Sequence, residues 1–186
     1  MTGKPAAAVR ATPAPARPVR AGRPAQLVAR PALRPADDLA ANESGAYDIL
    51  GGARLIKRRP SSRAEVHAML VDGMPYAVLF HLTSGIHALA EQDVFNVVGI
   101  SERTLRRQKD SPRKTMPADL ASRTWLFAET LAKAAEVFGG REEAERWMAG
   151  EAMGLDGARP IELMRTVQGA ELVNEFLVRL EHGVYT

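Results

Sequence analysis

Residues 94–109 read VFNVVGISERTLRRQK, and this stretch decides the fold. Apolar residues at helical spacing run up to Gly99, which readily takes the left-handed backbone conformation of a tight turn. Ile100 then supplies an apolar plug, and the hydroxyl of Ser101 can cap a second helix that Leu105 anchors inward. The stretch therefore predicts a helix-turn-helix.

The second helix of this motif is expected over residues 102–109, and its outer face is basic. Between Ser101 and Lys114, six basic residues stand against two acidic ones. Long cationic side chains can contact phosphates, while threonine, glutamine or arginine can read base edges in a major groove. The candidate DNA-binding residues are Ser101, Arg103, Thr104, Arg106, Arg107, Gln108 and Lys109. The alternative is a charged helix face that is only solvated, so operator binding stays open at this point.

Helical signals continue on both sides of the motif. Apolar residues recur at spacings of three and four, and glycine or proline separates the groups. Ser62 and Glu65 form the pattern of a capping box, with the side chain of Glu65 reaching back to an amide. Helices are predicted over about residues 63–71, 76–83, 89–98, 118–138 and 141–148, and a further one opens at Pro160.

Gly169 is expected to separate the helix at Pro160 from a final helix that ends at Gly183. One side of this final helix is expected to face inward, with Leu172, Val173, Phe176, Leu177 and Leu180. Residues 53–56 are expected to form a small strand or an ordered lead-in, and residues 150–157 a flexible connection.

The first 36 residues differ in composition from the rest of the chain. They hold seven prolines, eleven alanines, seven basic residues and no acidic residue. Such a segment buries too little apolar surface to offset its chain entropy, so we expect a disordered basic tail. The tail either contacts a polyanion or is a solvated leader. The whole chain has a net charge of +3, of which the tail supplies +7, so the remaining residues carry −4. The high pI of the sequence therefore comes largely from the tail.

The fold class is therefore expected to be all-α. A helix-turn-helix domain is predicted over residues 37–140, and a small helical domain over residues 141–186. The sequence has no cysteine, which excludes disulfides, thiol nucleophiles and thiolate metal sites. No apolar run approaches the roughly 20 residues that cross a bilayer, so a soluble cytoplasmic protein is expected, with no membrane partner.

The chain also lacks the patterns of common active sites. Its four histidines show no metal-binding spacing, its adjacent carboxylates suit no acid–base pair, and it has no phosphate-binding loop, dinucleotide fingerprint or nucleophile elbow. We therefore expect no enzymatic activity, no catalytic residue, no metal and no cofactor.

The segment Gly99 to Arg107 resembles the Xre-like (Xre/MbcA/ParS) antitoxins, which partner RES-domain toxins. The resemblance covers about Ile49 to Thr186 in the family's order and is most specific in the C-terminal part. It continues through residues 49–52, 73–76, 135–139, 144–148, 157–163, 169–170 and 181–185. The chain departs from the family pattern at Gln108, where a basic residue is common, and in residues 150–157, which lack a Pro-Asn pair.

This resemblance implies an Xre-like domain followed by a C-terminal toxin-binding domain, usually in a dimer. It also implies a cognate RES-domain toxin that consumes NAD⁺ and is held inactive by this chain. The candidate toxin-binding residues are Gly157, Arg159, Pro160, Leu163, Glu181, His182, Gly183, Val184 and Tyr185. The competing hypothesis is a transcriptional regulator whose C-terminal domain only forms the dimer.

Physical reasoning gives these C-terminal residues distinct roles. Gly157 allows a tight turn, Arg159 projects near a helix start, and Pro160 fixes the entry to that helix. Val184 and Tyr185, at the end of the chain, form an apolar and aromatic tip that can plug a partner's surface. The alternative is that these two side chains fold back onto the last helix.

Overall fold

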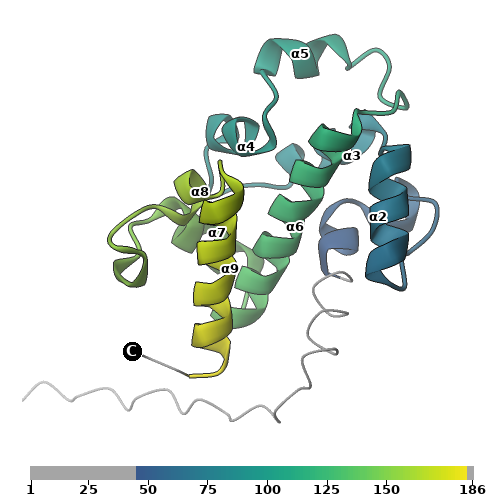
Figure 1. Ribbon diagram of the computed structural model, residues 1–186. Coiled ribbons are helices and arrows are strands. Elements are labelled where there is room, and N and C mark those ends of the chain that lie inside the picture. Colours follow the sequence, from purple (N-terminus) through teal and green to yellow (C-terminus); the bar gives the residue numbers. More distant parts are fainter. Residues whose placement is uncertain (1–44, 184–186) are drawn as a thin grey trace, which may run out of the picture. The chain divides into compact units, whose positions relative to one another are not determined.

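The computed structural model describes residues 45–183, which belong to one compact unit of the chain. The expected tail at residues 1–36 and the expected tip at Val184 and Tyr185 lie outside the described residues. Residues 45–183 form helices joined by turns and loops, with no strand among them, as the all-α prediction requires (Figure 1). None of their helices is long and apolar enough to span a membrane.

The described chain begins with a helical stretch at residues 45–49. The following elements are η1 Gly52–Arg54, α2 Arg63–Asp72, α3 Tyr76–Ser84, α4 Glu91–Val98, α5 Glu102–Arg107, α6 Ala118–Phe138, α7 Arg141–Ala149, η2 Met153–Leu155, α8 Pro160–Leu163 and α9 Val167–Glu181.

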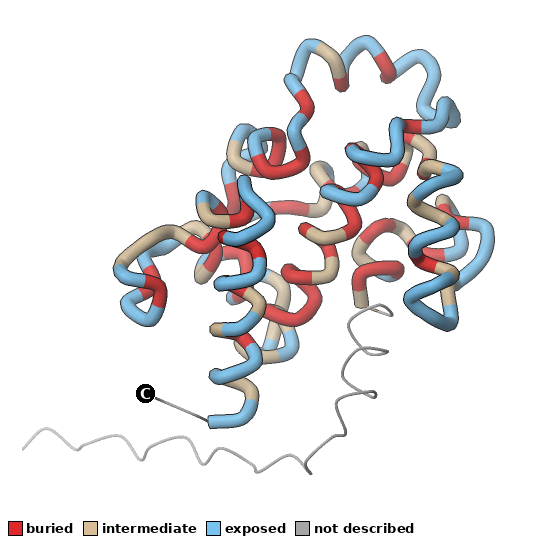
Figure 2. Tube along the Cα trace, viewed as in Figure 1, coloured by how far each residue is buried: buried red, intermediate tan, exposed pale blue. Residues whose placement is uncertain are grey.

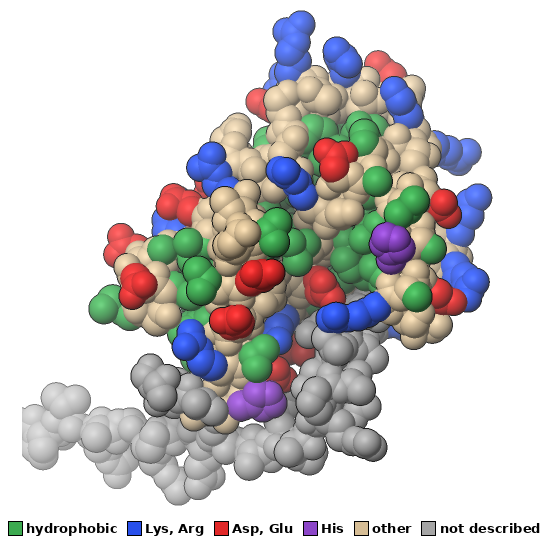
Figure 3. Space-filling view, viewed as in Figure 1, with side chains coloured by type: hydrophobic (Ala, Val, Ile, Leu, Met, Phe, Trp, Pro, Cys, Tyr) green, Lys and Arg blue, Asp and Glu red, His purple; other side chains and the backbone are tan. Residues whose placement is uncertain are grey.

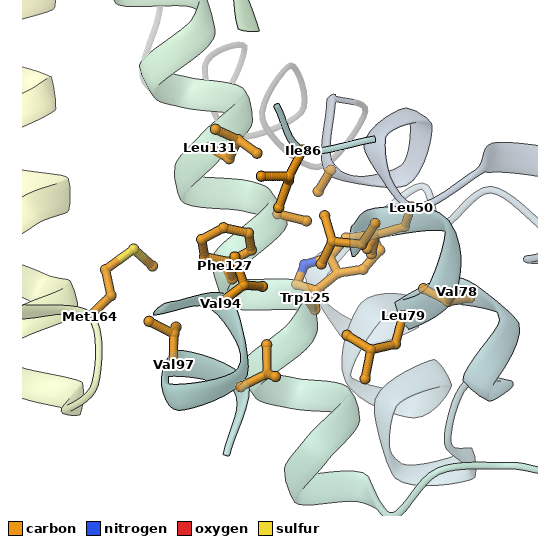
Figure 4. Packing of buried hydrophobic residues seen from close by; sticks show 14 of the residues in the cluster. Leu50, Val78, Leu79, Ile86, Val94, Val97, Trp125, Phe127, Leu131 and Met164 are labelled. Atoms are coloured by element: carbon orange, nitrogen blue, oxygen red, sulfur yellow. The ribbon is translucent and has the colours of Figure 1, made fainter. Parts of the chain in front are cut away.

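The long helix α6 organises the packing. Its apolar and small residues recur at helical spacing, and α2, α4, α7 and α9 all contact it (Figure 1). Figure 4 shows Trp125 and Phe127 of α6 among the side chains of α3 and α4, including Leu79 and Val94. Trp125, Phe127, Leu79 and Val94 are all buried. Each large side chain buried in this way contributes roughly 1.5–3 kcal/mol to the stability of the fold.

The hydrophobic core is continuous across the expected domain boundary at residues 140 and 141. The same cluster of buried side chains runs from Ala46 in the first helical stretch to Leu177 in α9, and it includes Met148 of α7 and Ile161 of α8. Buried positions follow the inward sides of the helices on both sides of this boundary (Figure 2). The predicted domains 37–140 and 141–186 therefore share one core within the described residues.

The capping box at the start of α2 forms with a shift of one residue. The Ser62 hydroxyl accepts the amide of Glu65 at 3.3 Å, as predicted. The Glu65 carboxylate, however, accepts the Ser61 amide at 2.7 Å and the Ser61 hydroxyl at 2.9 Å. These hydrogen bonds, first of all the amide bond, lower the pKa of Glu65. The contribution to stability is therefore present at neutral pH and is lost as the pH falls through the lowered pKa.

Two expectations for loops differ from the structure. Residues 52–54 form the 3-10 helix η1, so the strand alternative for residues 53–56 is wrong. Residues 150–157, expected to be flexible, are organised around η2: the Gly157 amide donates to the Ala152 carbonyl at 3.1 Å, and the Ala152 amide to the Ala158 carbonyl at 3.1 Å. Because Ala152 and Leu155 are buried, this connection belongs to the core.

The role of Gly169 is also corrected. It lies inside α9, whose cap is Thr166, and its amide donates to the Thr166 hydroxyl at 3.0 Å. A Cβ at Gly169 would lie 2.0 Å from the carbonyl oxygen of Leu163, so the glycine allows α8 to approach α9 instead of separating two helices. Leu172, expected inward on α9, is 52% exposed.

Candidate functional site

The helix-turn-helix consists of α4, a turn at Gly99 and α5. Gly99 adopts the left-handed conformation, with φ of 77°, and its amide donates to the Phe95 carbonyl at 2.9 Å. Ile100 is buried, and the Ser101 hydroxyl accepts the Thr104 amide at 3.1 Å. Leu105 is buried as predicted, but α5 ends at Arg107, two residues earlier than expected.

The candidate DNA-binding residues do not all reach the surface. Ser101, Arg103, Arg106, Arg107 and Lys109 are exposed, and Thr104 is half-buried. Arg103, Arg107 and Lys109 have no ion pair within residues 45–183, whereas Arg106 pairs with Glu102 at 2.6 Å. Gln108 is only 8% exposed. Its side chain is packed into the protein, so in this structure it is not available to contact bases in a DNA groove.

This basic helix lies at one end of the described unit. In Figure 1, α5 is far from the C-terminal end of α9, with α6 running between these two regions. Lys and Arg side chains protrude around the α5 end in the space-filling view (Figure 3). The basic helix α5 is therefore spatially separate from the candidate toxin-binding residues at the end of α9, whereas those at α8 lie beside α4 of the helix-turn-helix.

The candidate toxin-binding residues lie at two places. Gly157 has a left-handed backbone with φ of 75°, and Pro160 is buried at the first position of α8. Leu163 is half-buried at the end of α8. At the end of α9, Glu181 is half-buried while His182 and Gly183 are exposed.

Arg159 does not project freely as expected. Its guanidinium donates from Nε to the Ala149 carbonyl at 2.8 Å, from Nη2 to Asp93 at 2.8 Å, and from Nη1 to Glu162 at 2.9 Å. The hydrogen bond to Asp93, the largest cause, raises the pKa of Arg159, so this arginine keeps its charge throughout the pH range of a folded protein. Arg159 thus joins the end of α7 and the start of α8 to α4.

Glu145 forms a second link of this kind, which the sequence analysis did not identify. Its carboxylate is 1% exposed, and it accepts the amides of His87 and Ala88 at 2.8 Å each. It also accepts Nε of Arg141 at 3.1 Å. The sequence signal for this buried carboxylate is a glutamate four residues after an arginine, next to the core positions of α7. The same pattern also describes an exposed ion pair, so it does not by itself identify a buried one.

The hydrogen bonds of Glu145 and Arg159 fix the position of the first helix of the helix-turn-helix. Glu145 binds the segment just before α4, and Arg159 binds the first turn of α4 at Asp93. Both span large distances in sequence, 58 and 66 residues. The position of α4 therefore depends on side chains from α7 and from the start of α8.

A known protein family matches the C-terminal part of the chain. Residues 133–183 match the family described as Antitoxin Xre/MbcA/ParS C-terminal toxin-binding domain. This segment comprises the end of α6 together with α7, η2, α8 and α9.

Proteins named Antitoxin Xre are similar to a longer part of the chain. The chain is 29% identical to that of Yersinia enterocolitica over 131 residues, which cover 68% of this chain and 86% of the relative. It is 27% identical to that of Pseudomonas putida over 124 residues, covering 66% and 75%. It is 26% identical to that of Photorhabdus laumondii over 125 residues, covering 67% and 83%.

Proposed function

We propose that this chain, which is Xre/MbcA/ParS-like in sequence, is the antitoxin of a type II toxin–antitoxin pair. It binds and neutralises a RES-domain toxin that consumes NAD⁺, and it represses its own operon through α5. It acts as a cytoplasmic homodimer without enzymatic activity of its own. The observation that carries the proposal is the toxin-binding-domain match over residues 133–183.

The structure supports the assignment of DNA binding and toxin binding to different helices. The basic α5 stands at one end of the unit, and the matched segment supplies the helices α7 to α9 elsewhere. The alternative is a regulator whose C-terminal helices only form a dimer, and both hypotheses include self-association, for which the structure offers one observation. Val167, Leu172 and Val178 of α9 are exposed, and a second copy of the chain could cover them.

Co-expression with the product of the neighbouring reading frame tests the proposal, with growth and co-purification as readouts. A truncation at Gly154 would also remove the buried residues Ile161, Val173 and Leu177, so lost binding could reflect unfolding alone. A deletion of residues 183–186 is the better variant, because α9 ends at Glu181.

We expect the deletion of residues 183–186 to remove growth rescue while helical circular dichroism stays unchanged. Losing an apolar and aromatic anchor of an interface costs at least about 2 kcal/mol, or about 30-fold in Kd. Deletion of residues 2–5, at the other end of the chain, is the matched control. Rescue by the shortened chain at the level of the full chain would exclude this binding site, and no complex with either chain would favour the dimerising regulator.

DNA binding through α5 predicts a second result. Replacing Arg103 and Arg107 with alanine should weaken binding to the DNA upstream of the gene at least about tenfold and reduce the salt slope by about two. Arg106→Ala should have a smaller effect, because Glu102 already neutralises this side chain. Fluorescence anisotropy at several salt concentrations measures this, with exposed Arg165→Ala as the control. Equal affinity for the double variant would place the DNA surface elsewhere.

A further inference from the structure

A second basic surface lies upstream of the helix-turn-helix, in residues 54–59. Arg54, Lys57, Arg58 and Arg59 are all exposed, and no acidic residue occurs between positions 53 and 64. The backbone of this segment is attached to the core, because Ile56 is buried and its carbonyl accepts the Tyr47 hydroxyl at 3.2 Å. The segment therefore presents its cations from a fixed position.

These cations face the chain that leaves α5. A groove of about 1040 Å³ is lined by Arg54, Lys57 and Arg58 on one side and by Arg113 on the other. The second side is held to the start of α3, where the Tyr76 amide donates to the Lys114 carbonyl at 3.0 Å. Both sides of the groove are thus attached to the core of the same unit.

Most of the positive charge here is not neutralised. The carboxylates that line the groove are those of Glu65 and Asp72, and Glu65 is engaged by Arg58 and Ser61. Arg54, Lys57 and Arg113 have no ion pair in the part of the chain that the structure describes. Such exposed and unpaired cations are typical of surfaces that contact phosphates.

The charge of the unit is also unevenly distributed. Residues 141–183 hold nine acidic and five basic side chains. In Figure 3, Lys and Arg protrude around α5 and along the side at α2, while Asp and Glu predominate over the C-terminal helices. A polyanion is therefore attracted to the α5 end and repelled from α7 to α9.

We propose that Arg54 and Lys57 form a second contact with the DNA backbone, joined to α5 by Arg113. This inference rests on the proposed DNA binding by α5 and names further residues of that interface. Arg113 follows α5 closely in sequence, and the groove places Arg54 and Lys57 opposite Arg113. One turn of B-DNA is about 34 Å long, and in this proposal the duplex on α5 runs along the basic side at α2, which brings its phosphates to this region. Arg54 and Lys57 bind its phosphates and do not read its bases.

The double variant Arg54→Ala/Lys57→Ala in the full chain tests this. Affinity should fall about tenfold for the gene's own upstream DNA and equally for unrelated DNA of the same length, and the salt slope should decrease by about two. The ratio of the two affinities should not change, whereas Thr104→Ala in α5 should lower it. Both substituted side chains are exposed, so unchanged circular dichroism is expected, and Arg165→Ala serves as the control.

Three outcomes would overturn the proposal. If the wild type binds DNA and the double variant keeps the same affinity and salt slope, Arg54 and Lys57 do not contact DNA. This outcome leaves the role of α5 unaffected. Weaker binding to the toxin with unchanged binding to DNA would assign the groove to an acidic protein segment. A wild-type chain without salt-dependent DNA binding would overturn the role of α5 and this inference together.

Discussion

Glu145→Ala is expected to lower the free energy of unfolding by about 3–5 kcal/mol. The carboxylate is almost completely buried, and its removal leaves the amides of His87 and Ala88 without an acceptor. Arg141 would lose its partner as well, and its Nη2 atom is already buried without a hydrogen bond in the described residues. A cost of this size is a large fraction of the 5–15 kcal/mol that typically separates folded from unfolded protein.

Urea denaturation followed by circular dichroism measures this loss, and two further variants keep the result interpretable. Glu145→Gln retains one acceptor oxygen but turns an amide donor toward Arg141, so we expect an intermediate loss. Glu142→Ala, in the same helix, removes an exposed ion pair with Arg146 and should cost less than about 1 kcal/mol. If Glu145→Ala were no more destabilising than Glu142→Ala, the carboxylate would not hold the segment before α4.

The features that the sequence predicted well depend on neighbouring residues. The left-handed turn at Gly99 and the caps at Ser62 and Ser101 form within a few residues of chain. The long helix α6 was predicted with the observed bounds, because its apolar stripe and its flanking Pro117 and Gly139 are local signals. The exposed cations of α5 follow from the same local pattern.

The features that the sequence did not predict depend on distant residues. Gly169 was expected to end a helix, but its role is set by the carbonyl of Leu163 on another helix. Gln108 was expected to face DNA, but the tertiary fold buries it. Glu145 and Arg159 each have a distant partner, His87 and Asp93, which lie 58 and 66 residues away in the chain, where no spacing rule applies.

Arg159→Lys is expected to destabilise the protein by about 2 kcal/mol, although it conserves the charge. The planar guanidinium reaches Asp93, the Ala149 carbonyl and Glu162 at the same time, and a lysine ammonium does not match this fork. Glu162→Ala removes only the most exposed of these partners, so it should cost less than 1 kcal/mol, on the order of a surface ion pair. Thermal unfolding distinguishes these variants.

A charge exchange between Asp93 and Arg159 separates this link from general damage to the fold. Each of Asp93→Arg and Arg159→Asp alone places two like charges together in a half-buried site, whereas the double variant restores an opposite pair. We expect the double variant to be more stable than the two single losses predict, by about 1–2 kcal/mol. Additive losses would mean that the pair does not couple α4 to α8. Because α4 carries the turn to α5, the single variants should also weaken DNA binding, and the exchange should recover it in parallel with stability.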